Sequence, residues 1–189
     1  MPVSINGNGS VVGVTSVTGA GMDLIVPTSV AGTGVTLSGG QVNFSAAASV
    51  SVNGCFTSTY ANYFLVFNAS ATGGGNVTFR YRSAGTDNST TNYTRRALYI
   101  NVSTTPQGLY SASSSSALDI TTPTTGGSYI GHIVAPQLAQ QTMSTINWIS
   151  QNFGGTSTDI FTATTQFDGI SFIESSLTGT LRIYGLRNS

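Results

Sequence analysis

The feature that most constrains the fold of this chain is a repeated alternation of apolar and polar residues. In "NVTFRYRSAG", Val77, Phe79 and Tyr81 fall on one face of an extended strand, and the polar residues between them fall on the other. Runs of the same kind include "NYFLVFNA", "YTRRALYINVS", "SYIGHIVA", "MSTINWIS", "TDIFTATTQF" and "DGISFIES". Gly, Asn, Ser, Thr or Pro separates them at short intervals, which is typical of a sandwich or barrel. The sequence therefore predicts an all-β fold with little helix, a two-sheet antiparallel sandwich of jelly-roll-like type.

The closing run, "TLRIYGL", predicts a last strand that lies inside this sandwich. Leu181 and Ile183 alternate there with Arg182 and Tyr184, and few residues follow. A terminal segment frays unless neighbours hold it, and a strand is held by lying between partners in a sheet.

The first 43 residues differ from the rest of the chain. No aromatic residue precedes Phe44, and Asp23 is the only charged residue before it. Small apolar residues and glycines gain little burial for the entropy they lose on ordering, so we expect no independent core here. We divide the chain into an extended N-terminal arm, residues 1–43, and a β-sandwich domain, residues 44–189.

The arm has two physically sensible positions. It lies as strands along the edge of its own sandwich, or it adds strands to a neighbouring subunit. The arm residues that we expect at an interface are Ile5, Val11, Val12, Val14, Met22, Leu24, Ile25, Val35 and Leu37.

The low charge argues against several partners. Charged residues make up 6% of the chain and the formal net charge is +0, whereas ordinary soluble domains are about 25% charged. Nothing therefore attracts a phosphate backbone, and we expect no nucleic-acid binding. Apolar runs are broken well short of the roughly 20 residues of a membrane span, so we expect no membrane partner. The opening "MPVSINGNGS" lacks the features of a secretory signal, and we expect folding in a cytoplasm.

The chain also lacks a recognisable catalytic or metal-binding motif. His132 is the only histidine, and no serine sits in a G-x-S-x-G turn. Cys55 is the only cysteine, and a buried structural position is typical of a free cysteine. Asp168 and Glu174 lie near the two ends of one expected strand, too far apart for glycoside hydrolysis. A Ca²⁺ site in the loop around Asp87 is conceivable, but a polar hairpin loop is the simpler interpretation. We predict no enzyme activity, no cofactor and no metal.

Sugar binding is harder to exclude from the sequence. Aromatic side chains stack on saccharides, and Tyr93, Tyr110, Tyr129 and Trp148 are candidates by residue type. An aromatic residue in a strand is more often part of the core, and no spacing here selects a site.

Three segments resemble the small β-sandwich surface proteins of tailed bacteriophages. They are "FTSTYANYFLVFN", "VTFRYRSAGTDNSTTNY" and "GISFIESSLTGTLRIYGL". The patterns Y-x-N-Y-x-x-x-F/V, R-x-R-x-A-G and G-T-x-R-I-Y-G within them carry the likeness, which covers about residues 55–186. The resemblance implies a virion protein, commonly trimeric and often of jelly-roll type. It holds at packing positions, so no functional residue is carried over.

The leading hypothesis is a non-enzymatic capsid decoration (cement) protein. It would fold in the host cytoplasm and then sit on the virion surface, where it would bind the major capsid protein and stabilise the shell. The resemblance implies a homo-oligomer, with a trimer favoured. The alternative is a tail-fibre or receptor-binding component that recognises a host-surface glycan. A secreted carbohydrate-binding or adhesin domain is a third interpretation, weakened by the absence of a signal sequence.

Overall fold

The structure, a computed structural model, describes residues 4–5, 11–12, 21–72, 76–101, 109–120, 126–150 and 153–187. Every regular element in these ranges is a β-strand, and none of them contains a helix with the length and apolarity needed to cross a membrane. The strands are β1 (Ser4–Ile5), β2 (Val11–Val12), β3 (Met22–Leu24), β4 (Ser29–Ala31), β5 (Val35–Ser38), β6 (Gln41–Asn53), β7 (Asn62–Ala71), β8 (Val77–Ser83), β9 (Thr86–Asp87), β10 (Tyr93–Asn101), β11 (Leu109–Ser115), β12 (Leu118–Ile120), β13 (Gly127–Val134), β14 (Thr142–Ser150), β15 (Phe153–Phe161) and β16 (Gly169–Leu186).

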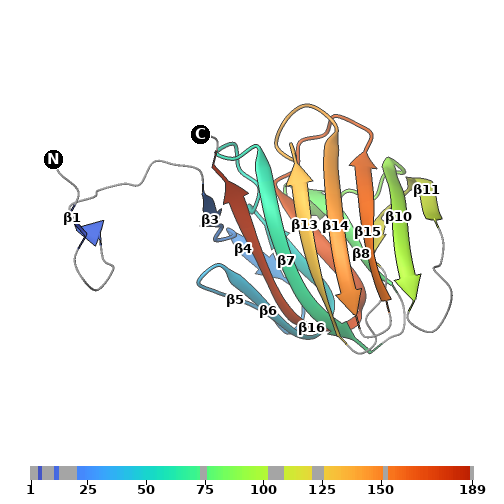
Figure 1. Ribbon diagram of the computed structural model, residues 1–189, viewed down its shortest axis with the longest axis horizontal. Helices are drawn as coiled ribbons and strands as arrows, with labels where there is room; N and C mark the ends of the chain where they lie inside the picture. Colours follow the sequence, from blue (N-terminus) through green and yellow to red (C-terminus); the bar gives the residue numbers. More distant parts are fainter. Residues whose placement is uncertain are drawn as a thin grey trace.

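The strands form two packed layers, which confirms the predicted antiparallel sandwich (Figure 1). The larger sheet contains β11, β10, β15, β14, β13, β7 and the second part of β16, in that order. The smaller sheet is built from β12, β8, the first part of β16, β6 and β4, with β9 beside β8. All pairings are antiparallel, so each layer can carry one face toward the core and one toward the surroundings.

The strand β16 belongs to both layers. It is 18 residues long; residues 169–173 pair with β8 in the smaller sheet, and residues 177–186 pair with β7 in the larger one. Its register against β6 shifts between these two parts, where the strand bends. Gly179 lies just after the bend, and a Cβ there would be 1.9 Å from the carbonyl oxygen of Asn68, so the close approach requires glycine. The closing run thus has β7 on one side and β6, followed by β3, on the other, so it is held on both sides as predicted.

The core lies between the layers and is rich in aromatic side chains. Phe67 of β7 stacks on Phe172 of β16 with ring centroids 4.3 Å apart, which joins the two sheets. Farther along, Tyr81 stacks on Phe167 at 5.0 Å, and Phe161 meets Phe167 edge to face. Full burial of each such ring contributes roughly 2 kcal/mol. The predicted inward face of β8 is confirmed, since Val77, Phe79 and Tyr81 are buried.

The segment from residue 21 to residue 38 takes the first of the two positions expected for the arm. The strand β3 pairs with β16, and both β4 and β5 pair with β6 of the same chain. The boundary after residue 43 therefore falls inside β6. Ile25 is 8% exposed, and Val35 and Leu37 pack against the same core. Ile25 thus lies in the core of its own subunit, and Val35 and Leu37 are partly buried against that core. Their assignment to an interface between subunits stays a prediction.

The remaining arm residues divide into two groups. Met22 and Leu24 are exposed on β3. The strands β1 and β2 pair with each other in a separate two-stranded sheet. Val14 and the side chains of Ile5, Val11 and Val12 lie outside the described residues.

A polar clamp fixes β3 to the chain segment that follows β16. The Arg187 Nε donates to the Asp23 carboxylate at 2.7 Å, and the Tyr60 hydroxyl donates to the same oxygen at 2.8 Å. Both hydrogen bonds favour the charged carboxylate and hold the pKa of Asp23 at about 2. The backbone N–H of Ile25 donates to Ile183, so the start of the sandwich is tied directly to its last strand.

Candidate functional site

A row of large side chains crosses the outer face of the larger sheet. Tyr184 of β16 pairs in register with Phe64 of β7, and Phe64 pairs with His132 of β13. Leu24 of β3 pairs with Tyr184 on the other side of β16 and extends the row, with Met22 two residues away on the same face. Side chains at register positions on one face of a sheet are neighbours, so these residues form a continuous surface.

A second row lies beside the first, two residues along each strand. Arg182 of β16 pairs with Val66 of β7, and Val66 pairs with Ile130 of β13. We call the two rows together the platform. The platform consists of Met22, Leu24, Phe64, Val66, Ile130, His132, Arg182 and Tyr184.

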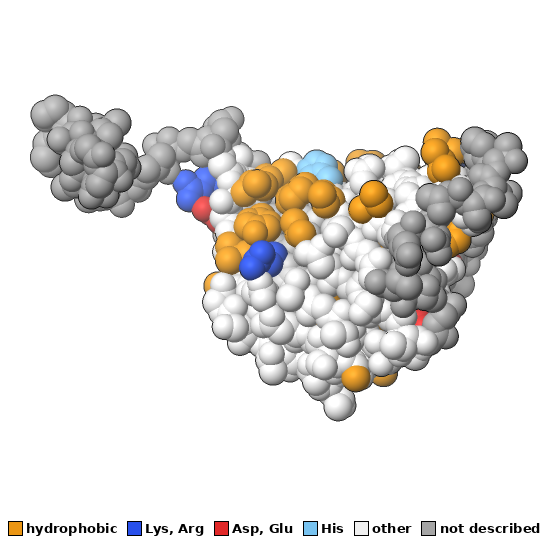
Figure 2. Space-filling view, turned by 60° about the horizontal axis from the view of Figure 1, so that its bottom comes forward, with side chains coloured by type: hydrophobic (Ala, Val, Ile, Leu, Met, Phe, Trp, Pro, Cys, Tyr) orange, Lys and Arg blue, Asp and Glu red, His pale blue; other side chains and the backbone are white. Residues whose placement is uncertain are grey.

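The platform exposes large apolar side chains. Met22 is 57% exposed, Ile130 45% and Leu24 40%, while Phe64 is half-buried between its neighbours. Figure 2 shows hydrophobic side chains gathered on one region of the surface, with few charged groups beside them. The outer faces of sandwiches are usually polar, and contiguous exposed apolar patches mark interaction sites. The platform is therefore the candidate functional site.

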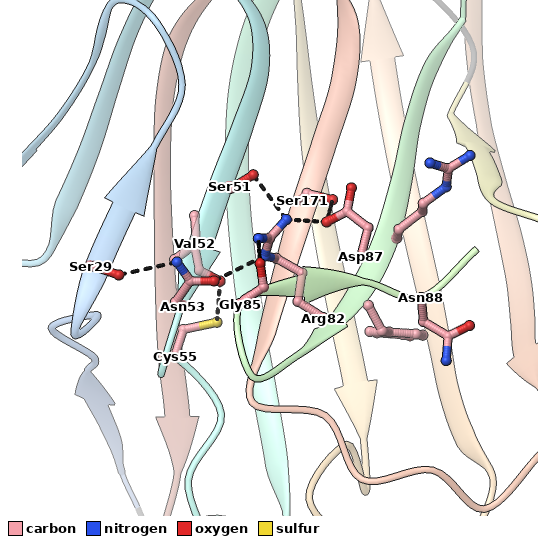
Figure 3. Close-up of polar contacts among 12 residues, drawn as sticks. Ser29, Ser51, Val52, Asn53, Cys55, Arg82, Gly85, Asp87, Asn88 and Ser171 are labelled. Atoms are coloured by element: carbon pink, nitrogen blue, oxygen red, sulfur yellow. Dashed lines mark hydrogen bonds and ion pairs between the residues drawn. The ribbon is translucent and has the colours of Figure 1, made fainter. Parts of the chain in front are cut away.

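The outer face of the smaller sheet is polar by contrast. Arg82 of β8 forms an ion pair with Asp87 of β9, and its Nε donates to the Asn53 side chain at 2.9 Å (Figure 3). Its Nη1 also donates to the Ser51 hydroxyl at 3.0 Å, and the Ser171 hydroxyl donates to Asp87 at 2.9 Å. We call these five residues the Arg82 network. It joins β6, β8, β9 and β16, and it engages the loop carboxylate that was considered for Ca²⁺.

A third polar group lies between the layers. Asp159 of β15 is 1% exposed, accepts a hydrogen bond from the Ser157 hydroxyl at 2.9 Å, and lies 3.9 Å from the Arg95 Nε. The Arg95 guanidinium lies 5.4 Å from the centre of the Trp148 ring. Burial raises the pKa of Asp159 to about 7, although Arg95 opposes the shift. This group is enclosed by the core, so it acts on stability rather than on a substrate.

Of the residues considered for chemistry, His132 is exposed on the platform, whereas three of the four aromatic residues considered for sugar binding are buried. Tyr93 is 0% exposed, Tyr129 1% and Trp148 4%, so all three belong to the core. The side chain of Tyr110 is not among the described ones. Cys55 is buried as predicted, and burial raises the pKa of its thiol. Within the described ranges, His, Cys, Asp and Glu side chains form no group that could hold a metal ion.

The sequence analysis missed most of the platform, although it named Met22 and Leu24. The missed signal is in "NYFLVFNA", where Tyr63 to Phe67 are apolar without interruption instead of alternating. Such a run indicates a strand with apolar side chains on both faces. In β7, Tyr63, Leu65 and Phe67 point into the core, and Phe64 and Val66 point outward.

Comparisons with known proteins do not assign this chain to a family. No protein-family model matches the chain, and no curated protein sequence matches it. Among solved structures, one similar chain is a prokaryotic β-1,3-1,4-glucanase (lichenase) from a mouse hindgut metagenome, with 11% identity, a TM-score of 0.27, and coverage of 81% of this chain and 83% of that one. Another is domain 4 of AbnA, an extracellular GH43 arabinanase from Geobacillus stearothermophilus in complex with arabinotriose, with 13% identity, a TM-score of 0.28, and coverage of 90% and 78%. Scores this low support no inference about function.

Proposed function

We propose that this chain is a non-enzymatic phage virion protein that decorates the outer capsid shell and attaches to it through the platform. The observation that carries the proposal is the exposed apolar surface on the larger sheet. Met22, Leu24 and Ile130 remain largely accessible there. The resemblance of the strand segments to phage surface sandwiches supports the assignment to a virion. The platform supports the assignment of an attachment surface.

The mechanism of stabilisation is differential burial. Apolar area removed from water contributes about 25 cal/mol per Å². A copy that rests its platform on a seam of the shell loses this contact when the shell expands or ruptures, so the intact shell is favoured. Many copies on one particle multiply a modest gain per copy. The low charge of the chain makes such contacts depend little on salt.

Recognition of a host-surface glycan is the alternative function, and the structure gives it less support. Stacking on a saccharide needs an accessible aromatic ring, and three of the four aromatic residues considered for it, Tyr93, Tyr129 and Trp148, are buried. A glycan array separates the two functions, because the decoration protein binds capsids and no immobilised sugar.

The test is an add-back experiment on capsids of the encoding phage that lack this protein. We expect the wild-type chain to bind in many copies per particle and to raise the temperature at which the particles release DNA. Ile130→Asp places a charge in the centre of the platform and should abolish both effects. Leu98→Asp is the matched control, because Leu98 is 54% exposed on the same sheet face but three strands away on β10.

Two results would contradict the proposal. Capsids without the protein that resist heat and chelators as well as decorated capsids would exclude a stabilising role. Equal binding of the wild-type and Ile130→Asp chains would exclude the platform as the attachment surface. The trimeric state stays a prediction, which light scattering on the purified chain measures directly.

A further inference from the structure

The charged side chains are unevenly divided between the surfaces of the sandwich. Asp87 and Asp159 face Arg82 and Arg95, and Asp23 faces Arg187 at the edge of β3. Of the other carboxylates, Asp119 lies on the smaller sheet and Glu174 at the bend of β16, and Asp168 accepts from the backbone N–H of Ala84. None of these three lies on the outer face of the larger sheet.

The outer face of the larger sheet carries exposed arginines instead. Arg182 lies inside the platform, and Arg96 lies far from it on β10. Both side chains are exposed. Within the described part of the chain, the Arg182 guanidinium has no hydrogen-bond or ion-pair partner. Its nearest register neighbour is the apolar Val66, followed by Ile130.

An arginine in this position restricts what can cover the platform. Removing a guanidinium from water inside an apolar contact is strongly unfavourable unless an acceptor replaces the lost water. A carboxylate is the best replacement, because its two oxygens match the planar fork of the guanidinium in a bidentate pair. A basic surface, or an uncharged surface with no acceptor at that point, leaves Arg182 desolvated and unpaired.

We infer that the platform docks on an apolar protein surface that carries a carboxylate, and that Arg182 forms a bidentate ion pair with that carboxylate. This inference rests on the proposed function, in which the covering surface belongs to the major capsid protein. Phe64, Val66 and Ile130 supply the apolar contact, and Arg182 supplies register and selectivity. A capsid surface without an acidic side chain at that point is rejected.

The test compares single variants for their affinity toward the undecorated capsids. Arg182→Glu should weaken binding by about a hundredfold, because it places two carboxylates against each other. Arg182→Lys keeps the charge without the fork and should weaken binding roughly tenfold. Arg96→Glu is the matched control on the same sheet face and should bind like the wild type. Urea unfolding of each variant shows whether its fold is intact.

A second measurement addresses the partner. Capsid carboxylates are converted to amides with a carbodiimide and glycinamide before the protein is added. The amidated capsids should lose affinity for the wild-type chain by about the same factor as Arg182→Gln loses on untreated capsids, and amidation should change Arg182→Gln binding little. The proposed ion pair is overturned if the Arg182→Glu chain binds the capsids with the affinity of the wild type. It is also overturned if amidation of the capsids weakens binding of the wild type and of Arg182→Gln by the same factor. If Ile130→Asp also binds like wild type, the proposed attachment surface itself fails.

Discussion

The two outer faces of the sandwich differ in whether their few charged groups are paired within the chain. On the smaller sheet, the Arg82 network pairs a cation with an anion of the same chain. The hydroxyls of Ser51 and Ser171, which are buried, form hydrogen bonds within this network. On the larger sheet, the platform leaves Arg182 exposed among apolar side chains. The polar groups of the smaller sheet are therefore paired in the isolated subunit, whereas the apolar surface and the cation of the larger sheet would be stabilised by a matching partner.

Under the proposed function, a chain with 6% charged residues thereby separates the groups that stabilise its fold from those that bind a partner. A charged pair whose hydrogen bonds are already formed within the subunit gains little free energy from the polar groups of a partner. An apolar face with an unpaired cation contributes little to folding and much to a matching interface.

The largest loss of stability should come from Arg82→Met. The side chain of Arg82 is 9% exposed. Its removal leaves the Asp87 carboxylate without its cation, with the Ser171 hydroxyl as a remaining donor, and leaves the side-chain oxygen of Asn53 without the Arg82 donor. We expect the free energy of unfolding to fall by about 3 kcal/mol in urea titrations. Arg182→Met is the control, and its free energy of unfolding should change by less than about 0.5 kcal/mol. Equal losses in the two variants would remove the contrast between the faces.

The buried pair of Arg95 and Asp159 should make the free energy of unfolding depend on pH in the opposite sense from an ordinary salt bridge. The pKa of Asp159 is about 7 in the folded chain and about 4 in the unfolded chain. Between these values the folded state binds a proton that the unfolded state does not, so the free energy of unfolding falls as pH rises. We expect a fall of about 2 kcal/mol from pH 5 to pH 7.

Asp159→Asn isolates this contribution, because the amide does not titrate. Urea titrations at pH 5, 6 and 7 should show a smaller dependence on pH in the variant than in the wild type. An identical pH dependence in both chains would mean that Asp159 is ionised throughout this range and that Arg95 outweighs the effect of burial.

The smallest effect should come from the platform itself. Ile130→Thr shortens a side chain that is 45% exposed, and the free energy of unfolding should change by less than about 0.5 kcal/mol. Ile133→Thr on the same strand is the matched comparison, because Ile133 faces the core with 1% exposure. It should lose about 2 kcal/mol or more. A large loss from Ile130→Thr would mean that the platform supports the fold.

The alternation of residues predicted the two-layer class and the long strands such as β7, β8 and β14, but it did not predict β11 or β12. Phe79, Tyr81 and Ile183 point inward as their spacing requires. The division after residue 43 rested on the absence of aromatic residues before Phe44, and this position lies inside β6. Ile25 and Val42 instead bury their modest area against rings that later strands supply.

The platform and the double role of β16 depend on contacts that local patterns do not contain. The stretch "IESSLTG" interrupts the alternation and looks like a turn, yet β16 continues through it from one sheet to the other. Which strands become neighbours decides that Arg182 lies beside Val66 and that Tyr184 lies beside Phe64. These pairings join residues more than one hundred positions apart, and no period of two predicts them.

The strand β16 also sets the order of events on the ribosome. It pairs with β6 and β7 and also with β8, yet it follows all three of these strands along the chain. The strands β7, β13, β14, β15 and β10 can pair with one another before β16 is synthesised, whereas β6, within the described residues, has no pairing with β7 or β8 except through β16. The junction of the two layers, rather than either sheet, should therefore be the last part of the described fold to form during synthesis.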